Sequence, residues 1–274
     1  MESQAGGQAN APAVYLLFEA GQRPSAAAIH AFVEAWDTVL ISHDPAEPSS
    51  PDNNLTDPAF LDKQREAAGA GLAERWIELW YEGLTFDLSG LTPGPACALP
   101  PIAHAFDWRD GLPLDRFEAI RLGASPHLRG GERAQPVLRA MIRLARDMTL
   151  SFGSLAALVW PPSASLIGRR FFESTASAWL DGGPFPALGL TAFDETADGG
   201  LQTAGLALWT GQELHIAPDL AHDKVAATRL GVRLVNHLVM LGGIARDERV
   251  TALDGTRLVM VPSAGGRLVR VQRE

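Results

Sequence analysis

The spacing of apolar residues predicts a chain that mixes strands and helices from its first ordered segment. Residues 13–18, AVYLLF, form an apolar run of strand length. Pro24 and Ser25 then open a predicted helix, because a proline in the first turn loses no hydrogen bond. The buried face of this helix is predicted from residues at helical spacing, namely Ile29, Phe32, Val33 and Trp36.

Prolines interrupt the next part of the chain. Segment 41–60 carries four of them among Ser, Asp and Asn, which blocks both a helix and a central strand. We predict a long exposed loop there, and the sequence leaves open whether it is a lid, an insertion or disordered. A helix is predicted over 62–81 and a strand over 83–88. A further strand over 99–106 is confined to a sheet edge by its two prolines.

The remaining pattern alternates between short strands and longer helices. A predicted helix over 219–241 ends at Gly242-Gly243, a typical C-terminal stop. The other predicted helices span 114–122, 133–152 and 163–180, and the predicted strands span 155–160, 189–193, 201–209, 213–216, 250–253, 257–261 and 268–271.

This order of elements favours an α+β fold with mainly antiparallel sheets. The stretch from Val14, strand then helix then Ala-Trp, is echoed from Ala157, which indicates two related halves of the form strand–helix–strands–helix. We therefore predict a disordered N-terminus over 1–12, an N-terminal half over 13–153 and a C-terminal half over 154–274. A doubly wound α/β sheet fits less well, because no Gly-rich phosphate turn follows the first strand.

The segment 205–218, GLALWTGQELHIAP, is predicted to be two short strands joined at Thr210-Gly211. Together with the strand that ends at Trp160 and the GLTAF stretch at Gly189, it resembles the uncharacterised bacterial proteins grouped as domain of unknown function family 4261. The residues that carry the resemblance are Gly205, Leu206, Gly211, Glu213 and Leu214. It covers most of 14–272 and implies no activity, because the family has none assigned.

The composition of the chain excludes more classes of function than any of its motifs does. The 274 residues carry a formal net charge of −9, and an acidic chain repels phosphate backbones, so we expect no nucleic-acid partner. The single cysteine, Cys97, cannot form an internal disulfide. The first residues lack the pattern of a signal peptide, and no apolar run reaches the roughly 18 residues of a membrane span. We expect a soluble cytoplasmic protein without a membrane partner.

The first candidate site is a metal site formed by Glu213, His215, His222 and Asp223. Residues two apart on a strand share a face, and Glu and His are ligands of Zn²⁺ and Fe²⁺. The alternative is structural: Glu213 pairs across a strand or holds the turn, while Asp219 and Asp223 stabilise the start of the following helix. The spacing matches no standard ligand motif.

The second candidate site is a positive stripe of Arg139, Arg143 and Arg146 on one helix. It is placed to receive a carboxylate, a phosphate or an acidic partner. The alternative is that these arginines form the solvated face opposite the buried face of an amphipathic helix.

Nucleophile and nucleotide motifs are missing from the sequence: no Gly-x-Ser-x-Gly turn and no phosphate-binding glycine frame occurs. We therefore predict a binding protein, not an enzyme, with no cofactor and with a protein partner or a second copy as ligand. A role in bacterial toxin immunity or secretion fits this character. The alternative is a metal-dependent enzyme or metal-binding protein that uses the cluster at 213–223.

Overall fold

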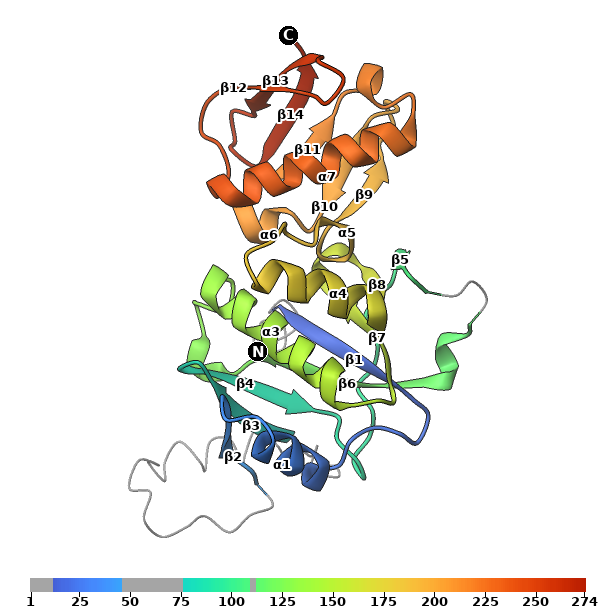
Figure 1. The fold of residues 1–274 in the computed structure, drawn as a ribbon, viewed down its shortest axis with the longest axis vertical. Helices are drawn as coiled ribbons and strands as arrows, with labels where there is room; N and C mark the ends of the chain where they lie inside the picture. Colours follow the sequence, from blue (N-terminus) through green and yellow to red (C-terminus); the bar gives the residue numbers. More distant parts are fainter. Residues whose placement is uncertain (1–11, 46–75, 109–111) are drawn as a thin grey trace, which may run out of the picture.

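The computed structural model describes residues 12–45, 76–108 and 112–274, and its strands form two sheets (Figure 1). The first sheet has the strand order β2-β3-β4-β6-β1-β7-β8-β5, and every neighbouring pair is antiparallel except β5 with β8. Its strands are β1 (Ala13–Glu19), β2 (Val39–His43), β3 (Trp76–Tyr81), β4 (Leu84–Ser89), β5 (His104–Phe106), β6 (Phe117–Ala124), β7 (Leu155–Trp160) and β8 (Ser165–Gly168).

The second sheet is built entirely from the C-terminal third of the chain, in the order β12-β13-β14-β11-β10-β9. It is antiparallel except between β11 and β14. The predicted α+β class with mainly antiparallel sheets is confirmed. The strands are β9 (Ala192–Glu195), β10 (Leu201–Ala204), β11 (Glu213–Ile216), β12 (Glu248–Thr251), β13 (Arg257–Pro262) and β14 (Leu268–Arg273).

Helices cover one face of each sheet (Figure 1). We call the helix-covered face of the first sheet its inner face and the opposite face its outer face. The inner face packs against α1, α3 and α4, and α7 lies across the second sheet. The helices are α1 (Ala26–Glu34), α3 (Gln135–Ser151), α4 (Arg169–Leu180), α5 (Ala187–Leu190), α6 (Ala207–Thr210) and α7 (Lys224–Leu241).

Strand alternation decides which side chains enter the core. In β3, Ile77, Leu79 and Tyr81 are almost fully buried on the inner face, so Trp76, Glu78 and Trp80 belong to the outer face. Further along the outer face, the segment between β4 and β6 covers a small second cluster built on Leu17, Ala119, Ala157, Val159 and Leu166.

An aromatic cluster joins the two sheets. The ring of Trp209 in α6 lies 6.2 Å from that of Trp160, 5.7 Å from that of Trp179 and 5.0 Å from that of Phe185, measured between centroids. Gln135 at the start of α3 donates a hydrogen bond to the Trp209 carbonyl at 3.0 Å. The main core therefore runs without a break from one sheet to the other.

Two predicted helices are strands in the structure. Residues 76–81, predicted as a helix end, form β3, and residues 114–122 form the short 3-10 turn η2 (Leu114–Arg116) followed by most of β6. Each of these strands is paired with a neighbouring strand on both sides, and this tertiary pairing outweighs the helical spacing of the apolar residues. Strand β8, which lies inside the predicted helix 163–180, was missed.

The predicted boundary after Gly153 does not coincide with the division between the sheets. Strands β7 and β8 lie beyond it, yet they belong to the first sheet. The two echoed stretches supply β1 and β7, which pair with each other instead of opening two equivalent sheets. The internal repeat is thus unsupported. Residues 41–43 of the predicted loop belong to β2, whereas 46–60, the N-terminus to residue 11 and the predicted helix over 62–75 lie outside the described residues.

Candidate functional site

The stretch 205–218 is not a hairpin, because its first half is a glycine turn followed by the single helical turn α6. Gly211, with φ of +76°, ends α6, and β11 then pairs with β10 and β14. The side chains of Leu214 and Ile216 are buried as the alternation predicts.

Glu213 holds this turn. Its carboxylate accepts hydrogen bonds from the backbone N–H groups of Gly205, Leu206 and Ala207 at 3.0, 3.2 and 3.0 Å, and from the Thr203 hydroxyl at 2.5 Å. Burial raises the pKa of Glu213, although these four donors favour its charged form and pull the pKa back down. All four donors belong to the same chain, so the carboxylate of Glu213 stabilises the turn. This is the structural alternative to the metal site that the sequence left open.

Two of the other predicted metal ligands have separate partners. His215 Nε2 lies 3.4 Å from a carboxylate oxygen of Asp198, and Asp223 caps α7 by accepting from Val225 and Ala226. His222 is exposed. Within the part of the chain that the structure describes, no group of three or more His, Cys, Asp or Glu side chains could hold a metal ion. The structure does not bring the four predicted ligands together.

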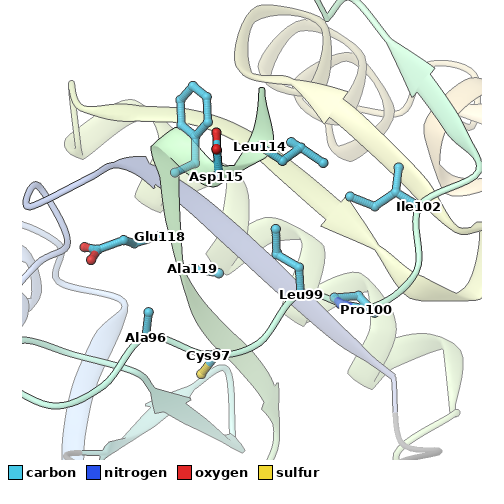
Figure 2. Close-up of a pocket in the computed structure, with 10 residues that line it drawn as sticks. Ala96, Cys97, Leu99, Pro100, Ile102, Leu114, Asp115, Glu118 and Ala119 are labelled. Carbon is cyan, nitrogen blue, oxygen red and sulfur yellow. The ribbon is translucent and has the colours of Figure 1, made fainter. Parts of the chain in front are cut away.

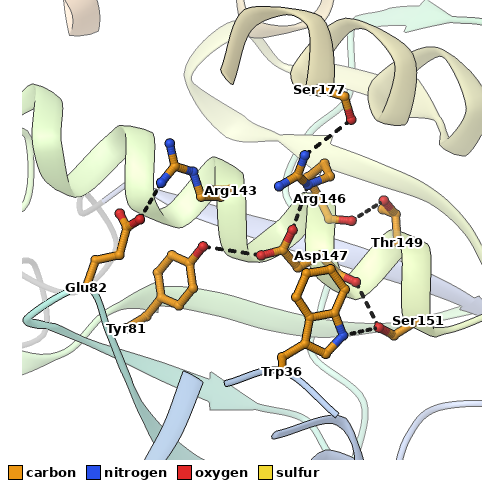
Figure 3. Close-up of polar contacts among 9 residues, drawn as sticks. All are labelled: Trp36, Tyr81, Glu82, Arg143, Arg146, Asp147, Thr149, Ser151 and Ser177. Carbon is orange, nitrogen blue, oxygen red and sulfur yellow. Dashed lines mark hydrogen bonds and ion pairs between the residues drawn. The ribbon is translucent and has the colours of Figure 1, made fainter. Parts of the chain in front are cut away.

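The arginines of the predicted stripe bond to other groups of the same chain, and Figure 3 shows two of them, Arg143 and Arg146. Arg139 donates to the Leu180 carbonyl at 3.0 Å, with its guanidinium carbon 4.8 Å from the Trp179 ring centre. Arg143 forms an ion pair with Glu82 in the β3–β4 turn. Each of these contacts ties α3 to a neighbouring element.

Arg146, the third member of the stripe, belongs to a buried network (Figure 3). Its Nε donates to the Asp147 carboxylate at 2.6 Å, and the Tyr81 hydroxyl donates to the same carboxylate at 3.2 Å. Burial raises the pKa of Asp147, and the adjacent Arg146 lowers it. The stripe is therefore neither an open anion site nor a purely solvated face.

A pair of acids that the sequence did not single out lies on the outer face of the first sheet. Glu78 in β3 and Asp87 in β4 are directly opposite each other in the strand register. Directly opposed like charges destabilise each other. One oxygen of Asp87 is buried and has no hydrogen-bond partner among the described residues. Burial, followed by the charge of Glu78, raises the pKa of Asp87 to about 6.

Cationic and aromatic side chains surround this acid pair. In the strand register Asp87 lies opposite Gly123. The guanidinium of Arg121 lies over Gly123, where an added Cβ would be only 2.7 Å from it, so this position of Arg121 requires a residue without a Cβ. The positive charge of Arg121 lowers the pKa of Asp87 but does not cancel the effect of burial. Glu78 accepts from the Ser42 hydroxyl at 2.8 Å and lies 3.5 Å from His127 Nε2.

Large apolar side chains lie beside the pair on the same face. Trp76 and Trp80 are two residues to either side of Glu78, and Leu40 is the register partner of Trp80. Leu40 is 54% exposed and Trp80 is 41% exposed. We call the surface formed by Leu40, Trp76, Glu78, Trp80 and Asp87 the acid–tryptophan face.

Replacing Asp87 with asparagine is expected to stabilise the protein. Between the ordinary aspartate pKa near 3.8 and the folded value of about 6, the folded state holds a proton that the unfolded state has lost. Stability from this group is greatest below pH 4 and falls as the pH rises through 6. At pH 7, Asp87→Asn should add roughly 1–2 kcal/mol, a figure reduced for solvent screening of the partly exposed carboxyl.

Denaturant unfolding of both proteins from pH 4 to pH 8 measures this effect. The difference in unfolding free energy between Asp87→Asn and the wild type should grow across pH 4–6 and then level off. A difference that does not change with pH, or a destabilised variant at pH 7, would show that Asp87 carries no unfavourable charge.

Comparison of the chain with protein-family models, with curated proteins and with solved structures found no match in any of the three. Among the described residues, no helix combines the length and hydropathy needed to cross a membrane. A proposal about function therefore rests on the contacts, burial and charges of the residues described above.

Proposed function

We propose that the protein is a non-enzymatic binding protein and that its acid–tryptophan face receives a cationic segment of a protein partner. The observation that carries the proposal is a buried oxygen of Asp87, opposite Glu78 in the strand register, that has no hydrogen-bond partner among the described residues. A buried acceptor without a donor costs free energy, and a lysine or arginine from a partner supplies both the donor and the charge.

The neighbouring aromatic rings support the same partner chemistry. Tryptophan faces attract ammonium and guanidinium groups, and tryptophan is enriched where protein interfaces bury the most free energy. The formal net charge of −9 favours approach of a positively charged partner over long range.

The competing occupants fit this face less well. A second copy of the chain would bring the same excess of negative charge to the acid pair. A metal ion would require further ligands beside Glu78 and Asp87, and no group of three is found among the described residues. The resemblance to domain of unknown function family 4261, the cytoplasmic location and a role in toxin immunity or secretion stay predictions.

Three acetylated and amidated heptapeptides test the proposed function: TKTSTST, TETSTST and TSTSTST. Two-dimensional NMR titration of the full chain at low ionic strength detects weak binding and locates it. The lysine peptide should shift amide signals in β3 and β4, whereas the glutamate and neutral peptides should not. Affinity should fall at least about tenfold in Asp87→Asn and in Glu78→Gln, because each removes one charge-assisted bond.

Glu173→Gln in α4 is the matched control, because it removes a carboxylate from the helix-covered side of the first sheet. Binding of the lysine peptide should be unchanged in this variant. Equal loss in Glu173→Gln and Glu78→Gln would mean that only net charge attracts the peptide. Failure of the lysine peptide to bind the wild type would overturn the proposed function.

A further inference from the structure

The outer face of the first sheet carries a hollow, and Figure 2 shows the residues that line it. Its volume is about 540 Å³, which lies within the range of pockets that hold small ligands or side chains. Most of its walls are apolar and come from the segment between β4 and β6 and from β6 itself. The apolar lining residues used below are Cys97, Leu99, Ile102, Leu114, Phe117 and Ala119.

Apolar side chains that line the hollow remain partly exposed to solvent. Leu99, Ile102, Leu114 and Phe117 are only partly buried against the small outer cluster. The carboxylate of Glu118 in its wall is already paired within the chain, since it accepts a hydrogen bond from Arg23 at 3.0 Å. An apolar group that enters the hollow would complete the cover over this cluster.

Strand geometry connects the hollow to the acid pair. Ser89 lies two residues from Asp87 on the same face of β4, and its hydroxyl is 3.7 Å from the Cys97 sulfur. On β6, Ala119 at the floor of the hollow is four residues from Gly123, the register partner of Asp87. Four strand residues span about 13 Å.

We propose that the partner presents an extended segment whose cationic residue meets Glu78 and Asp87 and whose large apolar residue, four positions away, enters this hollow. The inference rests on the proposed function. In an extended segment, residues four apart point to the same side and lie about 13 Å apart, which matches the spacing on the sheet. A helical segment would need about nine residues to cover that distance.

Alkylation of the single cysteine reports whether the hollow is occupied, because Cys97 lines it and is partly exposed. The probes are TKTSTFT, with lysine and phenylalanine four apart, TKTFTST, with the two residues only two apart, and TKTSTST, without an apolar residue. The measurements are the affinity of each peptide for the full chain and the rate at which N-ethylmaleimide alkylates Cys97 at saturating peptide.

TKTSTFT should bind at least about tenfold more tightly than TKTSTST, since a buried phenylalanine ring is worth that much or more. It should also slow alkylation of Cys97 at least about fivefold, whereas TKTFTST and TKTSTST should leave the rate unchanged. Leu114→Ala, which shortens one wall, should weaken TKTSTFT and leave TKTSTST unaffected.

The two proposals fail in different ways. Equal affinities of TKTSTFT and TKTSTST, with no protection of Cys97, would overturn this inference and leave the cationic site intact. Equal protection by TKTFTST would overturn the extended four-residue spacing. Absence of any lysine-dependent binding would overturn the proposed function, and this inference with it.

Discussion

Replacing Trp209 with alanine is expected to lower the free energy of unfolding by roughly 3–5 kcal/mol, the range measured for large aromatic residues in protein cores. Trp209 is 4% exposed and packs against Trp160, Trp179 and Phe185. Its indole N–H has no partner among the described residues, so the loss should come from packing and not from a broken hydrogen bond. Denaturant unfolding at pH 7 measures it.

Trp80→Ala is the matched control for this prediction. The same residue type is removed, but Trp80 is 41% exposed on the outer face. We expect a cost of less than about 1 kcal/mol there, as for most surface substitutions. Similar losses in the two variants would contradict the view that the aromatic cluster around Trp209 joins the two sheets.

Replacing Asp147 with alanine is expected to cost roughly 2–4 kcal/mol. The substitution leaves the buried Tyr81 hydroxyl without its acceptor and Arg146 without its carboxylate partner. Asp147→Asn should cost less, because the amide keeps an acceptor oxygen and because burial already penalises the charge of Asp147, whose pKa is raised.

A double-mutant cycle tests the cause of this loss. Tyr81→Phe should destabilise the wild type by about 1 kcal/mol and should cost much less when Asp147 is already alanine. If the two losses simply add, the Tyr81–Asp147 hydrogen bond makes no contribution and the effect of Asp147→Ala has another origin.

The elements predicted best from the sequence are a long helix with a sustained helical repeat of apolar residues and strands that are apolar throughout. Helix α3 has apolar residues at helical spacing over 17 residues, and Leu138, Met141 and Met148 are buried on this face. Strands β1 and β7 are continuous apolar runs. By contrast, β3 follows residues that read as a helix, and only its pairing with β2 and β4 fixes it as a strand.

This one error in element type also hid the acid pair. The β3–β4 turn is made by Glu82 and Gly83, which both have positive φ and suit a two-residue hairpin turn. Counting back from that turn places Glu78 opposite Asp87. A hairpin prediction for 76–89 would therefore have found the pair from the sequence alone, whereas its burial depends on the whole fold.

The two sites predicted from the sequence show why residue types alone do not identify a binding site: the contacts of each side chain must also be known. Glu213 and Arg146 do have the chemistry of a ligand-binding residue, but their oxygens and nitrogens bond to nearby backbone and side-chain groups of the same chain. Spacing along one element places side chains on a face. It does not tell which element packs against that face.

The affinity of the lysine peptide as a function of pH tests the central claim most directly, because it reads the charge of Asp87 at the binding site. Wild-type affinity for TKTSTST should be highest above pH 7 and fall as the pH drops through about 6, where Asp87 gains a proton. Arg121, Glu78, His43 and His127 face the same surface and are unchanged in the comparison with Asp87→Asn.

Asp87→Asn should bind the peptide weakly at every pH and should lack the fall centred near pH 6, while being more stable than the wild type at pH 7. Such a result would mean that the protein keeps a destabilising carboxylate for the sake of a ligand. If Asp87→Asn binds the peptide as tightly as the wild type, with the same dependence on pH, the acid–tryptophan face is not a cation-binding site.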